Sequence, residues 1–343
     1  MLADTALAVM WVGLTCYALF GGADFGAGVW DLLAGGARQG REQRRLIEHS
    51  IGPIWEANHV WLIFVIVLLW AGFSPVFASV MSTLYLPLTL AALGIIARGS
   101  AFAFRKASTE LWQQRLFGIF FAVSSLVTPF FLGAVAGAVA SGRVPAGLAQ
   151  GDVITSWLNP TSVLGGVLAV LACAHLAAVY LCADAAREDA PGLARAFARR
   201  AVVSGLAGGA VALAGTAVLH ADAPELFHGL THRALPLVVL SAVSGVVGLG
   251  LLLTRRHVAA RAAAALAVAA ILWSWGAAQY PAMLVGSLTV DEAASQPAVL
   301  SACLIVLACG AVLLVPALWL LYRTFQRAEP AAPTPASTHR TSN

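Results

Sequence analysis

Long apolar stretches separated by short polar connections follow one another along almost the whole chain. Each stretch is about 20 residues long, the length that a helix needs to cross the hydrocarbon core of a bilayer. Hydrocarbon offers the backbone no hydrogen-bond partner, so each stretch must pair its peptide groups internally, as a helix does. The pattern therefore predicts an all-α polytopic membrane protein with about nine transmembrane helices in bundles. The predicted spans are residues 6–33, 51–73, 78–97, 115–140, 161–184, 201–219, 234–254, 262–280 and 298–322.

Composition excludes two water-soluble domains, which the length of 343 residues would otherwise suggest. Hydrophobic residues make up 60% of the chain and charged residues only 10%, against about 25% charged in soluble proteins. The mean hydropathy is +0.84. We predict a transmembrane domain over residues 1–327 and a disordered cytoplasmic tail over 328–343, because the tail is rich in Pro, Ala, Thr and Ser without an apolar period. No basic residue precedes Arg38, so the first stretch is expected to be a retained span.

Basic residues alternate between the connections. All but two of the 20 lysines and arginines fall in or beside the first, third, fifth and seventh connections or after the last span. The two exceptions are Arg143 and Arg233. Under the positive-inside rule this distribution predicts that the N-terminus lies outside and the C-terminus in the cytoplasm. The net charge of +4 is then a topology signal, and we expect no nucleic-acid partner.

Few ionisable residues interrupt the predicted spans, and an ionisable side chain at membrane depth costs about 2.5–3.5 kcal/mol on insertion scales. They are Asp24, Glu56, His59 and His175. Helical rise places Asp24 about 13 Å before the inner end of the first span, and Glu56 and His59 about 7 and 12 Å into the second. Arg98 is expected near the end of the third span. We therefore predict one polar cluster shared by three consecutive helices.

The local sequences around the two acids support this cluster. Asp24 lies in GGADFGAG (Gly21–Gly28), whose glycines permit close approach of another helix or of water. Glu56 lies in GPIWEANHVW (Gly52–Trp61), where helical spacing places Trp55, Asn58 and His59 along one stripe beside the acid. Trp55 and Trp61 flank the acid and the amide. They are interfacial anchors or contacts for a quinone or a lipid chain.

Several interpretations of these polar residues remain open. The charges can pair and lock helices together, or they can form a proton path from the cytoplasm. Glu56 and His59 have the spacing of a di-iron carboxylate motif, but the spans contain only one such pair. His59 and His175 are the candidate haem ligands. A loop cluster of His220, His228 and His232 with Asp222 and Glu225 is either a solvated surface or a weak metal site.

The motifs taken in order resemble a known family. GGADFGAG is followed by SIGPIWEANHVWLIFV, by Arg98 in IIARGSAFAFR and by SSLVTPFFLGAVAGAVASG (Ser124–Gly142). Together they resemble subunit II of cytochrome bd-type quinol oxidases, in the cyanide-insensitive branch, whose second helix carries WEANHVW. WLNPTSVLGGVLAV (Trp157–Val170) and AHLAAVYL (Ala174–Leu181) fit the same family. Beyond about residue 200 the resemblance is one of layout.

The resemblance implies a subunit of the bacterial cytoplasmic (inner) membrane that pairs with a larger, homologous subunit I. That partner carries two b-type haems, one d-type haem and the quinol site, whereas this chain binds no haem by itself. The complex oxidises quinol, reduces dioxygen to water and builds a proton gradient. This chain is then expected to complete the bundle around the haem-bearing subunit and to supply part of a cytoplasmic proton path. A structural quinone and a small accessory subunit are further expectations of the resemblance.

Individual positions also carry over from the family. Asp24, Glu56 and His59 are the expected proton-path residues, and the supporting polar and aromatic residues are Trp55, Asn58, Trp61 and Arg98. Two positions depart from the family pattern. Gly21 stands where many members have a further acid, and Glu56 replaces the commoner Asp. The first departure removes a relay candidate, and the second keeps the chemistry with a longer reach.

Two rival functions remain. A proton-coupled secondary transporter also has Gly-rich spans and a few buried carboxylates, although no paired broken helices are evident. A cytochrome that binds haem itself would retain haem absorbance when expressed alone.

Overall fold

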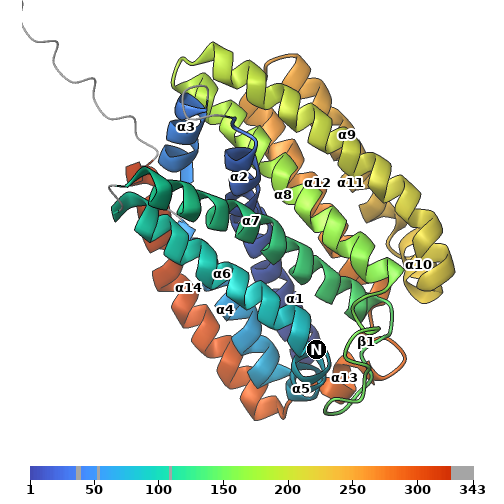
Figure 1. The fold of residues 1–343 in the computed structure, drawn as a ribbon. Helices are drawn as coiled ribbons and strands as arrows, with labels where there is room; N and C mark the ends of the chain where they lie inside the picture. Colours follow the sequence, from blue (N-terminus) through green and yellow to red (C-terminus); the bar gives the residue numbers. More distant parts are fainter. Residues whose placement is uncertain (36–39, 52–54, 108–109, 326–343) are drawn as a thin grey trace, which may run out of the picture.

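Helices that run side by side between two ends of the molecule make up almost all of the structure (Figure 1). The computed structural model describes residues 1–35, 40–51, 55–107 and 110–325. The helices are α1 (Leu2–Cys16), a π-helical turn η1 (Tyr17–Gly21), α2 (Gly22–Leu32), α3 (Arg41–Ile51), α4 (Trp55–Gly72), α5 (Ser74–Thr83), α6 (Tyr85–Ala107), α7 (Leu111–Ala140), α8 (Pro160–Arg187), α9 (Pro191–Asp222), α10 (Pro224–Thr231), α11 (Leu235–Leu253), α12 (His257–Gln279), α13 (Val290–Ala293) and α14 (Pro297–Phe325). A two-stranded antiparallel hairpin, β1 (Ala282–Leu284) and β2 (Leu288–Thr289), precedes α13.

The number of spans agrees with the prediction. Within the described residues, eight helices are long and apolar enough to cross a membrane, and α4 with α5 makes a ninth if that bent pair is one span. The first span is continuous from Leu2 to Leu32 through the π turn. The all-helical polytopic fold is therefore confirmed. The predicted tail at residues 328–343 lies outside the described residues.

The predicted position of the third span is wrong. A bend of 118° separates α4 from α5, so residues 74–83 leave the direction of α4 and form a short helix of their own. The span itself is α6, which runs to Ala107, ten residues beyond the predicted end. Residues 74–97 are almost continuously apolar, and hydropathy alone does not locate a bend inside such a stretch. Pro75, in the first turn of α5, marks the new helix start.

The basic connections lie together at one end of the bundle. Figure 1 shows α3, the connection between α8 and α9 and the connection between α11 and α12 at the same end. The N-terminus, α10, α13 and the hairpin lie at the opposite end. The alternation of basic residues along the sequence thus becomes a separation of charge in space.

The amphipathic helix α3 closes the basic end against α2 and α8. Its Leu46 and Ile47 are buried in the main core, whereas Arg41 and Arg45 remain exposed. The side chain of Arg44 pairs with Asp31 on α2, with Nε 3.3 Å from Oδ1. Burying the apolar stripe of α3 while leaving its charges in water is the usual arrangement for a surface helix.

Candidate functional site

An ion pair deep in the bundle joins the first span to α6. Asp24 and Arg98 are 3% and 2% exposed, and Nη2 of Arg98 lies 2.6 Å from Oδ1 of Asp24. The same Nη2 donates a second hydrogen bond, of 2.8 Å, to the backbone carbonyl of Asp24. Each charge is expensive to bury alone, so the two residues depend on each other for their place in the bundle.

The rest of the Arg98 guanidinium is held by α7 and by two aromatic rings. Nη1 bonds to the hydroxyl of Ser125, which in turn donates to the backbone carbonyl of Phe121 at 2.6 Å. The guanidinium carbon lies 4.4 Å from the centroid of the Phe121 ring and 5.0 Å from that of Phe25. The guanidinium is thus enclosed by a carboxylate, a hydroxyl and two aromatic rings, all of which interact favourably with a cation.

Glycines in the GGADFGAG motif let the neighbouring helices approach this pair. A Cβ on Gly26 would lie 1.8 Å from the backbone oxygen of Cys173 on α8, so only a glycine fits this crossing. A Cβ on Gly28 would lie 2.0 Å from Oγ of Ser125 and 3.1 Å from Nη1 of Arg98. The motif therefore brings α8 to one face of α2 and the Ser125–Arg98 contact to another.

Helix α4 contributes Asn58, His59 and Trp61 to the same region. The side-chain amide of Asn58 donates to the backbone carbonyl of Phe20 at 3.3 Å. Phe20 lies in the π turn, so Asn58 ties α4 to this turn of the first span. The ring of His59 lies 6.3 Å from that of Phe25, and Trp61 packs against the cluster formed by Tyr17, Phe25 and Cys173.

The structure therefore brings together Asp24, His59 and Arg98 of the predicted polar cluster, and the predicted supporting residues Asn58 and Trp61 lie in the same region. The remaining predicted members are Trp55 and Glu56. They begin α4, but their side chains lie outside the described part of the structure.

Arg98 lies deeper than predicted. The sequence placed it at the end of the third span, where its charge would reach the surface, but α6 continues to Ala107. The nine residues from Arg98 to the end of α6 at Ala107 correspond to about 13 Å of helix. Arg98 pairs with Asp24 inside the bundle. The interpretation of Arg98 as a helix-end residue is therefore wrong, because α6 continues beyond it.

The sequence did not predict three residues that contribute to this region: Tyr17, Phe121 and Ser125. Ser125 had a signal, because a pair of serines, Ser124 and Ser125, interrupts an otherwise apolar stretch. Tyr17 and Phe121 had none, since an aromatic residue in an apolar span is ordinary.

The alternative metal and haem ligands have other partners in the structure. Nδ1 of His175 lies 2.9 Å from the backbone oxygen of Ala201, and a Cβ on Gly205 would lie 3.0 Å from the His175 ring, so α9 fills the space beside it. His59 lies beside rings of the first span, Tyr17 and Phe25.

The outer histidines have local partners as well. His228 and His232 stack with ring centroids 4.0 Å apart, and Asp222 pairs with Arg143. Across the part of the chain that the structure describes, no group of three or more His, Cys, Asp or Glu side chains could hold a metal ion.

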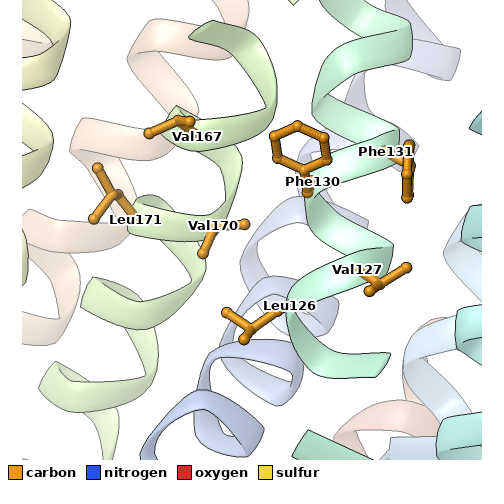
Figure 2. A pocket seen from close by; sticks show the side chains of 7 residues that line it. All are labelled: Leu126, Val127, Phe130, Phe131, Val167, Val170 and Leu171. Atoms are coloured by element: carbon orange, nitrogen blue, oxygen red, sulfur yellow. The ribbon is translucent and has the colours of Figure 1, made fainter. Parts of the chain in front are cut away.

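A hydrophobic pocket lies between α7 and α8, away from the ion pair. Figure 2 shows Leu126 and Phe130 of α7 opposite Val167 and Leu171 of α8. Its volume is about 370 Å³ and its lining is apolar. Such a pocket accepts hydrocarbon, and it has no polar group for proton chemistry.

The chain is similar to one protein family over most of its length. The family model that matches it, over residues 2–325, is described as cytochrome bd terminal oxidase subunit II. Two relatives are cytochrome bd ubiquinol oxidase subunit 2 of Bacillus subtilis (strain 168), 30% identical over 168 residues, and cytochrome bd-I ubiquinol oxidase subunit 2 of Escherichia coli (strain K12), 29% identical over 174 residues. These matches cover 49% and 48% of this chain, and 48% and 44% of the relatives. The chain thus spans about half the length of the curated relatives it matches.

The fold is similar to a solved structure as well. The bd oxidase from Geobacillus thermodenitrificans contains a chain that superposes with a TM-score of 0.75 and 27% sequence identity. The superposition covers 95% of this chain and 98% of that one.

Proposed function

The chain belongs to the cytochrome bd terminal oxidase subunit II family, and from this premise we propose that it is the non-haem subunit of a respiratory quinol:oxygen oxidoreductase. Its partner is a larger subunit I, which carries two b-type haems, one d-type haem and the site of quinol oxidation. The complex transfers electrons from quinol to dioxygen and forms a proton gradient across the bacterial cytoplasmic membrane. The motif WEANHVW in α4 favours the cyanide-insensitive branch of the family.

The N-terminus of the chain lies outside and the basic end of the bundle lies in the cytoplasm in this proposal. The positive-inside rule supports this orientation, since α3, the α8–α9 connection and the α11–α12 connection, which carry many of the arginines, share that end. Protons for water formation are then drawn through the cytoplasmic half of the first, second and third spans. Asp24, Glu56 and His59 carry them, while Trp55, Asn58, Trp61 and Arg98 support the path.

The observation that carries this role is the uneven pairing of the Asp24 carboxylate. Arg98 binds Oδ1 and fixes the side chain in place. Oδ2 is buried and has no hydrogen-bond partner, so it is the oxygen that can accept a proton or a water.

Purification of the tagged chain in mild detergent tests the proposed assembly. We expect a larger haem-bearing chain to copurify and the sample to absorb as a haem protein. A colourless chain that purifies alone contradicts the proposal and favours the transporter. Haem absorbance that remains when this chain is expressed alone would instead indicate that it binds haem itself.

Substitution of the buried acid tests the proposed proton path. Asp24→Asn keeps an oxygen for Arg98 but removes the proton-accepting carboxylate, so oxygen consumption per haem is expected to fall about tenfold or more. Glu56→Gln is expected to act in the same direction. The matched control is Asp189→Asn, at an exposed position after α8. Unchanged turnover per haem in both span variants would leave only a structural role for the acids.

A further inference from the structure

Three oxygens near the ion pair are buried without a hydrogen bond. They are Oδ2 of Asp24, the hydroxyl oxygen of Tyr17 and Oδ1 of Asn58. Their residues are only 3%, 7% and 2% exposed. Folded proteins rarely leave buried polar atoms unsatisfied, and ordered water is the usual partner where side chains provide none.

Tyr17 and the Asp24–Arg98 pair lie beside one aromatic side chain, Phe25, and Asn58 bonds to the same span. The ring of Tyr17 meets that of Phe25 edge-on, with centroids 6.5 Å apart, and Arg98, bonded to Asp24, lies over that Phe25 ring. Asn58 is tied to the π turn that begins at Tyr17, through its bond to the backbone of Phe20. The unpaired oxygens therefore come from one small region between the first span and α4.

The ring of Tyr17 lies against Gly21, in the same π turn. A Cβ on Gly21 would lie 3.0 Å from a ring carbon of Tyr17 and 3.6 Å from Cζ, the carbon that carries the hydroxyl. The phenol thus extends along the π turn to the level of Gly21. Gly21 is three residues before Asp24, a separation that places two positions on the same helix face. A side chain larger than glycine at this position would displace the ring.

A phenol hydroxyl is chemically suited to this place. It donates one hydrogen bond and accepts others, so it can give its proton to a neighbour while it receives another from a water. The exchange leaves Tyr17 neutral, and it needs neither a metal nor an electron. Phenylalanine would fill the same volume without this capacity.

We propose that Tyr17, Asn58 and Oδ2 of Asp24 enclose ordered water, and that the Tyr17 hydroxyl passes protons between this water and Asp24. In each transfer the Tyr17 O–H proton moves to the Asp24 carboxylate, directly or through one water. A second water returns a proton to the phenol oxygen and itself receives the incoming proton from the cytoplasmic side, so the phenol and both waters end neutral and the net result is one proton delivered to Asp24. The inference rests on the proposed function, since it adds a member to the same proton path.

The test compares Tyr17→Phe with Tyr280→Phe in the purified complex. Tyr280 lies after α12, and its hydroxyl bonds to Asp4 far along the chain from the ion pair, so its variant serves as a matched control. For Tyr17→Phe we expect normal haem content, oxygen consumption slower by about tenfold, and a larger solvent deuterium isotope effect. The isotope effect separates proton transfer from packing, because a purely structural change would not raise it.

The outcomes separate this inference from the proposed function. If Asp24→Asn slows turnover while Tyr17→Phe matches the parent in rate and isotope effect, the role of Tyr17 is wrong and the proton path stands. If neither variant changes turnover, both proposals fail. Should Tyr17→Phe assemble poorly, a high-resolution cryo-EM map of the unaltered complex decides. Water density within hydrogen-bond distance of the Tyr17 hydroxyl and Asp24 Oδ2 supports the inference, and protein side chains filling that space overturn it.

Discussion

Among the arginine–aspartate pairs that join separate elements of the described chain, Asp24–Arg98 and Asp222–Arg143 differ in what surrounds the carboxylate. Asp24 and Arg98 have side chains that are both 2% exposed, and one oxygen of Asp24 has no partner. Asp222 and Arg143, at the opposite end of the bundle, are 15% and 31% exposed. Both oxygens of Asp222 are bonded, one of them also to the backbone and hydroxyl of Thr161.

The difference separates a clamp from a site of chemistry. Asp222 ties the start of α8 and the residues after α7 to the end of α9, and every acceptor oxygen is used for that purpose. Asp24 is positioned as firmly by Arg98, yet it keeps one oxygen for another partner. The proposed proton path therefore rests on an unused acceptor on a fixed, buried acid, and not on burial alone.

The largest effect is expected from removal of the buried cation. Arg98→Met leaves the Asp24 carboxylate without its counter-ion inside the membrane, a loss of about 3–5 kcal/mol. We expect little assembled complex, measured as haem recovered with the tagged chain. The double variant Asp24→Asn with Arg98→Met removes both charges, so it should recover part of the yield. Normal recovery of the single variant would mean that the pair is not needed for the fold.

A smaller effect is expected where α2 passes the Ser125–Arg98 contact. Gly28→Ala places a methyl group 2.0 Å from Ser125 Oγ, so the helices must move apart at a cost of about 1–3 kcal/mol. The control is Gly209→Ala on α9, where nothing lies within 4 Å of the new methyl group. Thermal unfolding of the complex should shift down for Gly28→Ala only. Equal melting temperatures would show that α2 and α7 leave room for the methyl group beside Ser125.

The smallest effect is expected at the clamp. Asp222→Asn removes the charge that binds Arg143 but keeps an acceptor for Thr161, and the loss is about 1 kcal/mol. We expect a slightly lower melting temperature and unchanged oxygen consumption per haem. Asp24→Asn should give the reverse pattern, with a large loss of turnover. A loss of turnover in the Asp222 variant would remove the distinction between the two pairs.

The sequence predicted the fold well because the length of its apolar runs has a direct physical consequence for the backbone. A run of about 20 apolar residues can satisfy its backbone in lipid only as a helix, so the nine spans and their alternation followed directly. The bend between α4 and α5 did not follow, because apolar residues continue through it. Pro75 is the local signal, but a proline near a helix start is common and does not give the angle.

The candidate site was predicted in part, and the missing part has one cause. Asp24, Asn58 and His59 stood out because polar residues are costly within a span. Arg98 was assigned to a helix end because the sequence did not reveal the bend between α4 and α5. The third span was therefore placed too early in the chain, and it ended at Arg98 instead of at Ala107. Tyr17 and Phe121 look like ordinary apolar-span residues in the sequence. Only the packing buries the Tyr17 hydroxyl without a partner and places the Arg98 guanidinium over the Phe121 ring.

By itself, then, the sequence determined how many helices span the membrane, which end of the bundle carries the basic residues, and which acids require an explanation. These properties depend on the transfer of single segments and side chains into lipid, and composition along the chain fixes that free energy. Only the tertiary structure decided that Arg98 binds one oxygen of Asp24, that Gly28 makes room for Ser125, and that the other oxygen of Asp24 and the Tyr17 hydroxyl are both buried without a hydrogen bond. Such contacts join residues far apart in sequence, and their geometry exists only once the helices have packed.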